Sequence, residues 1–335
     1  SWIENVMLTA RNLRKHAPRY DSSPSTSGAP ELEIIMPSFP KPFVALLVGF
    51  SLMSSLGLSQ ETKKPKVTKK PVIKALLIAG GCCHDYDNQI QILTQGLSQR
   101  ANVEWEILLG ANSRDRKLPI YQTDDWAKGY DVIVHNECYG ATSDVEFVER
   151  IVRGHTKYKI PMVAIHCSMH SYRNAKTDKW RELLGVTSRR HEKRAEQGLE
   201  VVNRAPKHPI MIGFGESWAT PKGELYVIEK SWPNMSVLAS AFGVQGKRDQ
   251  ACIWTNEYQG CRVFGTTLGH HNETMLCQEY LDTVSRGLLW ACGKIQENGA
   301  PLPGYEGSGQ EKILLPYMIK EQVPGPSPTP AKRGN

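Results

Sequence analysis

Residues 161–173 read PMVAIHCSMHSYR, and this stretch decides the fold that the sequence predicts. The apolar run 162–165 has the pattern of a buried strand, and it ends abruptly at His166, Cys167 and Ser168. A segment with helical potential follows. α/β proteins expose a reactive side chain where a strand ends in a tight turn and enters a helix. The stretch therefore predicts the class of fold and, at the same point, the place of a site.

Strand and helix patterns alternate around this stretch. The strands that we predict in the first half of the chain are 74–80, 103–109, 131–135 and 161–165, with helices at 88–99 and 143–154. The run KALLIAG is almost continuously apolar, as in a strand that is buried on both faces. Strands separated by helices of this length predict a doubly wound, mostly parallel sheet with helices on both faces.

In the second half of the chain the strand and helix patterns no longer alternate. Residues 186–223 are polar and predict a long loop region. The short strands expected after it are 224–229, 237–242, 252–255 and 262–268. The segment NEYQG joins the last two as a hairpin, and residues 273–293 have the pattern of one amphipathic helix. The expected fold is a three-layer, flavodoxin-like α/β domain over residues 73–300 with a β-hairpin extension.

The two ends of the chain predict segments outside this domain. Residues 1–35 are polar and rich in Pro and Ser, which predicts disorder, and residues 301–335 predict a disordered tail. Residues 36–59 contain an apolar run that ends in small residues, so we expect a signal peptide cleaved before Gln60 and a periplasmic or secreted protein. The run is shorter than the ~20 residues of a membrane span, although a single anchor or a buried helix stays an alternative. Residues 60–72 form a Lys/Pro-rich linker.

The distribution of charge argues against nucleic acid as a partner. The chain of 335 residues carries a formal net charge of +7. Residues 60–74 contribute +5 of this, whereas residues 75–309 sum to −1. A protein that binds nucleic acid needs its basic excess on the folded body, where it can neutralise phosphates. We therefore expect no nucleic-acid partner, and no membrane span once the signal peptide is cleaved.

The eight cysteines do not predict a disulfide framework. Cys82 and Cys83 are adjacent, the sequence has no CxxC motif, and a core of this size needs no covalent cross-links. Cys252 and Cys261 flank the predicted hairpin, but a tight turn between its strands places Cys261 opposite Asn256 rather than opposite Cys252. We expect most of the thiols to be buried as small hydrophobic side chains.

Histidines recur directly after the predicted strands. His84 follows the first strand, His135 ends the third, His166 follows the fourth, and His270 follows a later one. Because parallel strands bring their carboxyl ends to one edge, these side chains are expected to share a crevice, although a single loop histidine is more often a surface residue. Cys167 is either a nucleophile activated by histidine or an inert packed thiol.

Four motifs together resemble a known family. They are GGCCHDY, IHCSMHSYR, HPIMIGFGESWATPKGELYVIE and WTNEYQGCRVFGTTLGHH, and their order and spacing are similar to those of the trehalose-utilisation (ThuA-like) family. The resemblance runs from residue 74 to residue 293. It implies a class I glutamine amidotransferase-like fold and a role around sugars. His191 and His208 also fall where the family carries histidine, which makes His191 a site candidate and His208, next to Pro209, a structural residue.

The chain departs from the amidotransferase pattern at the central strand. Glutamine amidotransferases carry their catalytic cysteine directly after this strand, whereas His166 stands there in this sequence and Cys167 follows one position later. One step along a sharp turn changes the direction in which a side chain points. We therefore expect no glutaminase activity.

Two functions remain open from the sequence. The first is an exported enzyme that acts on a carbohydrate, with His84, His166 and His270 doing acid/base work or holding a divalent metal such as Zn. The second is a non-catalytic module that binds a saccharide or a protein. In that case Trp218, Tyr226 and Trp254 would offer stacking surfaces, although such residues more often pack in a core. A homo-oligomer stays open under both.

Overall fold

The computed structural model describes residues 70–193, 196–309 and 319–320. The predictions of disorder for residues 1–35 and of a signal peptide for residues 36–59 lie outside the described residues, as do most of the linker and most of the tail. Within the described part, no helix is both long enough and apolar enough to cross a membrane.

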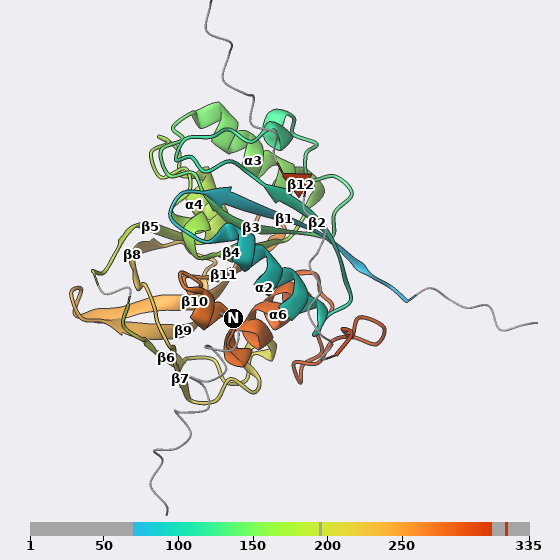
Figure 1. Cartoon of the computed structure of the whole chain (residues 1–335), viewed down its shortest axis with the longest axis vertical. Helices are drawn as coiled ribbons and strands as arrows, with labels where there is room; N and C mark the ends of the chain where they lie inside the picture. The colour runs from blue at the N-terminus through green and yellow to red at the C-terminus, as the bar shows by residue number, and fades with distance from the viewer. Residues whose placement is uncertain (1–69, 194–195, 310–318, 321–335) are drawn as a thin grey trace, which may run out of the picture. The chain divides into compact units, whose positions relative to one another are not determined.

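Ten strands of the described part form one mixed sheet (Figure 1). Its parallel half has the order β12 (Ile319–Lys320), β2 (Val103–Leu109), β1 (Ile73–Gly81), β3 (Val132–Cys138), β4 (Met162–Ile165) and β11 (Cys261–Thr266). Its antiparallel half continues with β10 (Arg248–Tyr258), β9 (Ser236–Gly243), β6 (Glu200–Asn203) and β7 (Ser217–Ala219). A separate antiparallel pair joins β5 (Val186–His191) to β8 (Tyr226–Ser231). The doubly wound, mostly parallel core and the antiparallel extension are confirmed.

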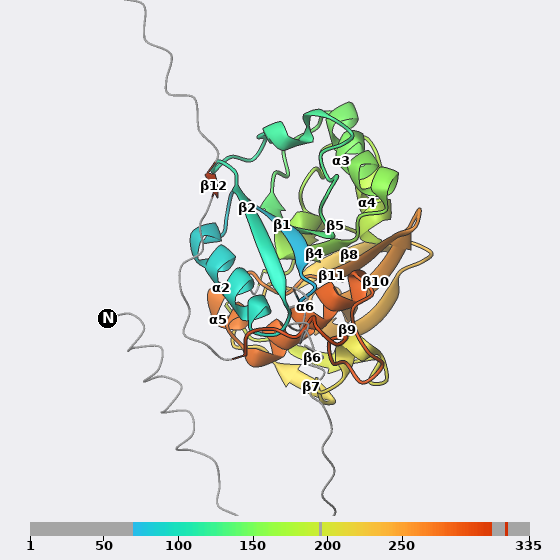
Figure 2. The same ribbon diagram turned by 90° about the vertical axis from the view of Figure 1, so that its right-hand side faces the viewer.

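Helices cover both faces of the parallel half, which gives three layers (Figures 1 and 2). The helices α2 (Tyr86–Ser98) and α6 (Gln278–Ala291) pack into the hydrophobic core on one face. The helices α3 (Val145–Tyr158) and α4 (Lys179–Leu184) pack into the core on the other face. Leu77 of β1 belongs to the first core and Leu76 to the second, so successive side chains of this strand are buried on opposite faces. This explains why the strand reads as a continuous apolar run.

The second half of the chain corrects two expectations. The region 186–223 is not a long loop, because β5, β6 and β7 lie within it. These strands have only six, four and three residues, so their hydrophobic pattern is weak. The single helix expected at 273–293 is divided into α5 (Asn272–Met275) and α6.

Two further boundaries differ from those expected. The β10–β11 hairpin pairs Cys261 with Tyr258 instead of Asn256, because Gln259 and Gly260 form its turn with φ values of 49° and 81°. Residues 301–309, assigned above to the tail, are ordered against the domain: the Asn102 backbone N–H donates to the carbonyl of Tyr305 at 2.9 Å.

Candidate functional site

The turn after β1 places His84 at the carboxyl edge of the sheet. Gly80 and Gly81 have φ values of 129° and 99°, a region that side-chain-bearing residues rarely adopt. A Cβ at Gly81 would also overlap the carbonyl oxygen of Cys138 on the neighbouring strand β3. The glycines therefore let the chain leave the strand directly against its neighbour, and Cys82, Cys83 and His84 follow.

The turn after β4 buries His166. This residue opens the 3-10 turn η3 (His166–Met169) with a φ of 42°, a strained value for a residue other than glycine, and strain of this kind is concentrated at functional sites. Its Nδ1 lies 2.6 Å from the carbonyl oxygen of Thr267, which can only accept a hydrogen bond. Nδ1 therefore carries the hydrogen, and Nε2 presents a lone pair.

His84, His166 and His270 converge as the sequence predicted. The Nδ1 atom of His270 lies 3.1 Å from Nε2 of His84 and 3.2 Å from Nε2 of His166. One nitrogen from each ring lies within 4.8 Å of one from each of the others. The three residues are up to 186 positions apart in the chain, and the ends of β1, β4 and β11 bring them together.

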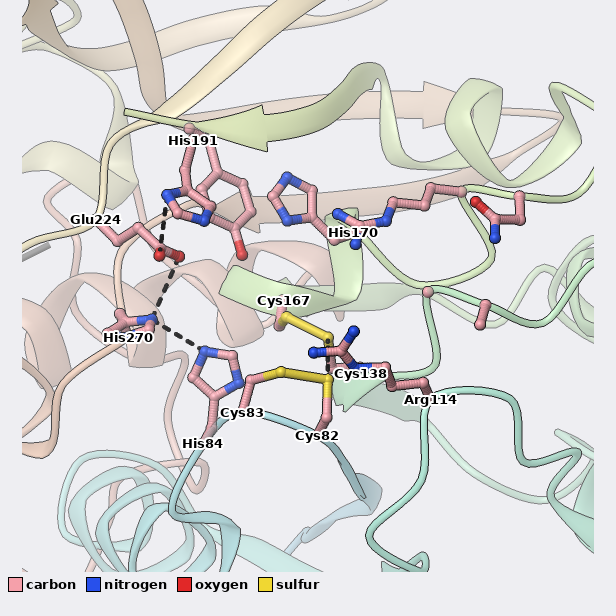
Figure 3. A pocket seen from close by; sticks show the side chains of 15 residues that line it. Cys82, Cys83, His84, Arg114, Cys138, Cys167, His170, His191, Glu224 and His270 are labelled. Atoms are coloured by element: carbon pink, nitrogen blue, oxygen red, sulfur yellow. Dashed lines mark hydrogen bonds and ion pairs between the residues drawn. A yellow bond between two sulfur atoms is a disulfide. The ribbon is translucent and has the colours of Figure 1, made fainter. Parts of the chain in front are cut away.

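Glu224 completes this cluster from the loop before β8. Its Oε2 atom lies 3.2 Å from Nε2 of His166 and 3.3 Å from Nδ1 of His270. Its Oε1 atom lies 3.2 Å from Nδ1 of His191, a residue at the end of β5 whose side chain is 43% exposed (Figure 3). The hydroxyl of Tyr226 lies 3.2 Å from Nε2 of His166. We call His84, His166, Glu224 and His270 the central cluster.

Burial sets the protonation of the central cluster. Removal from water, followed by the nearby charges of His166 and His270, lowers the pKa of His84 to about 2. Burial also lowers the pKa of His166. Burial alone would favour the neutral form of Glu224, but hydrogen bonding to His166 and His270 outweighs it and holds the pKa of the carboxyl group well below its usual range. The Glu224 carboxylate is therefore ionised beside the neutral imidazoles of His84 and His166.

The central cluster has more lone pairs than hydrogens. The Tyr86 hydroxyl donates its hydrogen to the carbonyl of Cys82 at 3.0 Å, so it accepts a hydrogen bond from Nδ1 of His84 at 3.2 Å. Nε2 of His84, Nε2 of His166 and Oε2 of Glu224 are therefore all acceptors. When the imidazoles are neutral, at most two hydrogens enter the cluster, one from the Tyr226 hydroxyl and one from the remaining ring. At least one acceptor is thus left without a hydrogen. A bound cation would satisfy this arrangement.

The ligand chemistry of the cluster fits a divalent ion such as Zn²⁺. Neutral imidazole nitrogens and a carboxylate oxygen are its usual ligands, at about 2.0–2.2 Å. The second nitrogen of His166 is held by a backbone carbonyl and that of His84 by a hydroxyl group, the arrangement that fixes the ring of a metal ligand. Ligand atoms around a tetrahedral ion at these bond lengths are about 3.3 Å apart, and three of the contacts in the cluster are 3.1, 3.2 and 3.3 Å.

A pocket of about 340 Å³ opens beside the central cluster (Figure 3). His84, His191, Glu224, His270 and Cys167 all line it, whereas His166 lies buried behind this wall with 1% of its surface exposed. The pocket lining also includes Cys82, Cys83, Arg114, Cys138, Gly140, Ala141, His170, Arg173, Asn174 and Tyr226.

Several residues of the pocket were missed by the sequence reasoning. His170 stacks on Tyr226 with ring centroids 3.8 Å apart, and burial lowers the pKa of its imidazole to about 3. Arg114 makes no side-chain hydrogen bond with another described residue, so its guanidinium is available to a ligand. These residues, like Glu224, lie in loops away from the strand ends on which the prediction was based. Only the motifs IHCSMHSYR and GELYVIE, which contain His170 and Glu224, drew attention to their neighbourhood.

His135 does not belong to the pocket and corrects the expectation of four converging strand-end histidines. It is fully buried within β3, with Nδ1 2.8 Å from Oε1 of Glu137 and Nε2 3.0 Å from Nε2 of His155. Nδ1 of His155 in turn lies 2.9 Å from the carbonyl oxygen of Ile160. β3 continues for three residues beyond His135, to Cys138, so His135 lies within the strand and its side chain is buried in the core.

We expect this buried histidine pair to make the protein sensitive to acid. Burial, and then the neighbouring His135, lowers the pKa of His155 to about 3 from its ordinary 6.5, so only the unfolded chain takes up this proton between those pH values. Stability is therefore complete above pH 6.5 and is lost as the pH falls toward 3, by about 1.4 kcal/mol per pH unit.

Urea unfolding of wild type and a His155→Gln variant at pH 7.5 and pH 5 checks this expectation. The loss of unfolding free energy between the two conditions should be about 2 kcal/mol smaller in the variant. An identical loss in both proteins would contradict the assignment.

The cysteines correct the expectation that no disulfides form. Cys82 is bonded to Cys83, and Cys138 at the end of β3 is bonded to Cys167 in η3 (Figure 3). Neither of the two alternatives stated for Cys167 describes this residue, because its sulfur is part of a disulfide and is neither a free nucleophile nor an inert thiol. Four cysteines are free, of which Cys252 and Cys261 are buried as predicted and Cys277 and Cys292 are partly exposed.

The remaining candidates have structural roles. Nδ1 of His208 accepts a hydrogen bond from the backbone N–H of Ile210 at 3.3 Å and caps a 3-10 turn, in line with the structural role expected for it. Trp254 has no exposed surface, and its indole N–H donates to the carbonyl of Leu184. Trp218 is only 8% exposed. Of the three aromatic residues proposed for stacking, only Tyr226 lines the pocket.

Comparisons with known proteins identify the family. A family model described as ThuA, trehalose utilisation, matches residues 74–291. The structure is similar to a ThuA-like protein of Parabacteroides merdae, with 19% identity, 71% of this chain and 97% of that chain covered, and a TM-score of 0.55. It is also similar to a ThuA-like protein of Bacteroides uniformis, with 16% identity and a TM-score of 0.50. This match covers 70% of this chain and 97% of that chain. No curated protein sequence matches significantly. The family match and the shared fold together show that the chain belongs to the ThuA trehalose-utilisation family.

Proposed function

We propose that this protein is an enzyme that acts on a carbohydrate, a disaccharide or a keto-sugar, with a divalent ion held by the central cluster. The observation that carries the proposal is the convergence of three imidazoles and the Glu224 carboxylate, with more lone pairs than hydrogens, on the wall of one pocket. The membership of the ThuA family supports a sugar as the substrate. The pocket volume of about 340 Å³ lies in the range of ligand sites, about 300–1,000 Å³.

The residues around the central cluster divide the remaining tasks. When bound, a divalent ion would polarise a sugar carbonyl or lower the pKa of a water molecule. His191 directs Nδ1 toward the carbonyl of Glu192 at 2.9 Å and toward Glu224, which leaves Nε2 as the basic nitrogen that can take a proton from the substrate. Arg114 and Arg173 line the same pocket, where their guanidinium groups could donate hydrogen bonds to sugar oxygens.

Metal analysis of the purified full-length chain, followed by incubation with disaccharides and oxidised sugars, tests the proposal. We expect about one bound zinc or similar ion per chain, and turnover that a chelator removes and added metal restores. A chain that binds no divalent ion at micromolar concentrations, or a bound ion whose removal leaves sugar turnover unchanged, would contradict the metal-assisted function.

Glutamine hydrolysis is expected to be absent. His166 occupies the position directly after the central strand, and Cys167 is bonded to Cys138, so no thiolate stands where the amidotransferase nucleophile would attack. Ammonia release from glutamine, measured with and without dithiothreitol, should not exceed the rate without protein. Release that disappears in a Cys167→Ala variant would show that the cysteine is a nucleophile after all.

Export is part of the proposal. The apolar run in residues 36–59 supports a signal peptide, and the two disulfides support an oxidising compartment, since such bonds are rare in the cytosol. N-terminal sequencing of the protein from its host should find a mature chain that begins near Gln60. A chain that keeps residues 43–58 in the cytosol would exclude export.

A further inference from the structure

Four sulfur atoms form a continuous group on the pocket wall. The disulfide between Cys82 and Cys83 adjoins the disulfide between Cys138 and Cys167, because the Sγ atoms of Cys82 and Cys138 lie 4.0 Å apart (Figure 3). Glycines and strand pairing fix this arrangement: Gly81 is paired with Cys138 in the β1–β3 register. We call Cys82–Cys83 the outer pair and Cys138–Cys167 the inner pair.

The two pairs differ in their access to solvent. Cys83 is exposed and Cys82 is partly exposed, whereas Cys138 and Cys167 are only 6% and 5% exposed. A reductant from solution thus reaches the outer pair more readily than the inner pair. The contact between the Sγ atoms of Cys82 and Cys138 joins the outer pair to the inner pair, so thiol–disulfide exchange between the two pairs can take place there. The exposure gradient and this contact together have the layout of a relay, in which one disulfide passes electrons to another.

We propose that the four cysteines form a thiol–disulfide relay through which a dithiol reductant, acting at Cys83, reduces the inner pair. The reductant first converts the outer disulfide into two thiols and is itself oxidised to a disulfide. The sulfur of Cys82 then attacks Cys138, a Cys82–Cys138 bond forms, and Cys167 leaves as a thiol with the proton that Cys82 loses. Cys83 finally attacks Cys82, which restores the outer disulfide and releases Cys138 as a thiol.

The net reaction transfers two electrons and two protons from the dithiol to the inner pair. Its product is a free Cys167 thiol directly beside His166, on the wall of the pocket that contains the central cluster. The outer pair directly precedes His84, so each step takes place next to a residue of the central cluster. The pocket therefore has an oxidised and a reduced form, whichever substrate it accepts.

A trapping experiment on the full-length chain tests the relay. In a Cys83→Ser variant, Cys82 has lost its disulfide partner and carries a free thiol, which should attack Cys138. The Cys82–Cys138 bond should then persist, because no thiol at position 83 is present to break it. Alkylation of free thiols followed by peptide mapping without reduction should find a Cys82–Cys138 cross-link and an alkylated Cys167. The matched Cys82→Ser variant leaves a thiol at Cys83 without the 4.0 Å contact, and it should keep the Cys138–Cys167 bond.

Reduction rates give a second measurement. In a Cys82→Ser, Cys83→Ser double variant, dithiothreitol should reduce the inner pair about tenfold more slowly than in wild type, since direct access replaces the relay. A Cys277→Ser control should reduce at the wild-type rate, and circular dichroism should show that all variants are folded. The relay is excluded if Cys83→Ser keeps the inner disulfide beside an alkylated Cys82, or if the double variant is reduced as fast as wild type.

Discussion

A His166→Ala variant is expected to lose its bound divalent ion and its activity on sugars while it keeps its fold. Nε2 of His166 lies within 3.2 Å of both His270 and Glu224, so its removal opens the central cluster. Loss of a residue that only supports a ligand costs about 10–100-fold in metal affinity, and loss of a ligand should cost at least about 100-fold. Zinc content after dialysis, together with circular dichroism, measures both parts of the expectation.

The control for this variant is His208→Ala. His208 is also a partly buried histidine beside a turn, but it lies outside the pocket and caps η4 (Pro209–Met211). The control should bind zinc as tightly as wild type. If His166→Ala still carries one zinc ion per chain, the central cluster is not the metal site, and its histidines would act through proton transfer alone.

A Gly81→Ala variant is expected to lose about 4 kcal/mol of unfolding free energy, a large part of the stability of a typical domain. Two costs add together: the φ of 99° is unfavourable for alanine, and the new Cβ would overlap the backbone of Cys138. The backbone cannot rotate away from this contact because β1 and β3 are paired there. Urea unfolding measures the loss.

Gly129→Ala separates the two costs. Gly129 has a φ of 96°, but a Cβ there would meet no atom within 4 Å. This variant should therefore lose only about 1–2 kcal/mol, the cost of the backbone conformation alone. Equal losses in the two variants would show that the contact with Cys138 does not constrain the turn before His84.

The parallel half of the fold could be predicted because its strands are buried on both faces. A strand such as β1 then becomes a continuous apolar run, and each run ends where the sheet ends, which placed His84, His166 and His270 at one edge. The strands of the antiparallel half were harder to predict from the sequence. Strands such as β6 and β7 have only three or four residues, too few for an alternating pattern to show.

The remaining parts of the site, Glu224 and the inner disulfide, depend on contacts between residues that are far apart in the sequence. Glu224 precedes β8, and no local pattern indicates that its loop passes beside His166 and His270. The inner disulfide could have been found, since β3 and β4 are neighbouring parallel strands that end in Cys138 and just before Cys167. Cys138 and Cys167 are 29 positions apart, so their spacing along the chain does not indicate that they pair; only the neighbouring strands of the predicted sheet bring them together.

The separation of the site residues along the chain also determines when the site can assemble during synthesis. A ribosome that adds about 5–20 residues per second needs roughly 10 to 40 seconds to proceed from His84 to His270, which lie 186 positions apart. Until His270 is added at the end of this interval, His84 and His166 lack this member of the central cluster. Adjacent Cys82 and Cys83 can already pair, whereas the Cys138–Cys167 bond must wait for β3 and β4 to meet. The divalent ion that we propose for the central cluster could therefore bind at full affinity only to a chain whose carboxyl-terminal part has emerged and folded.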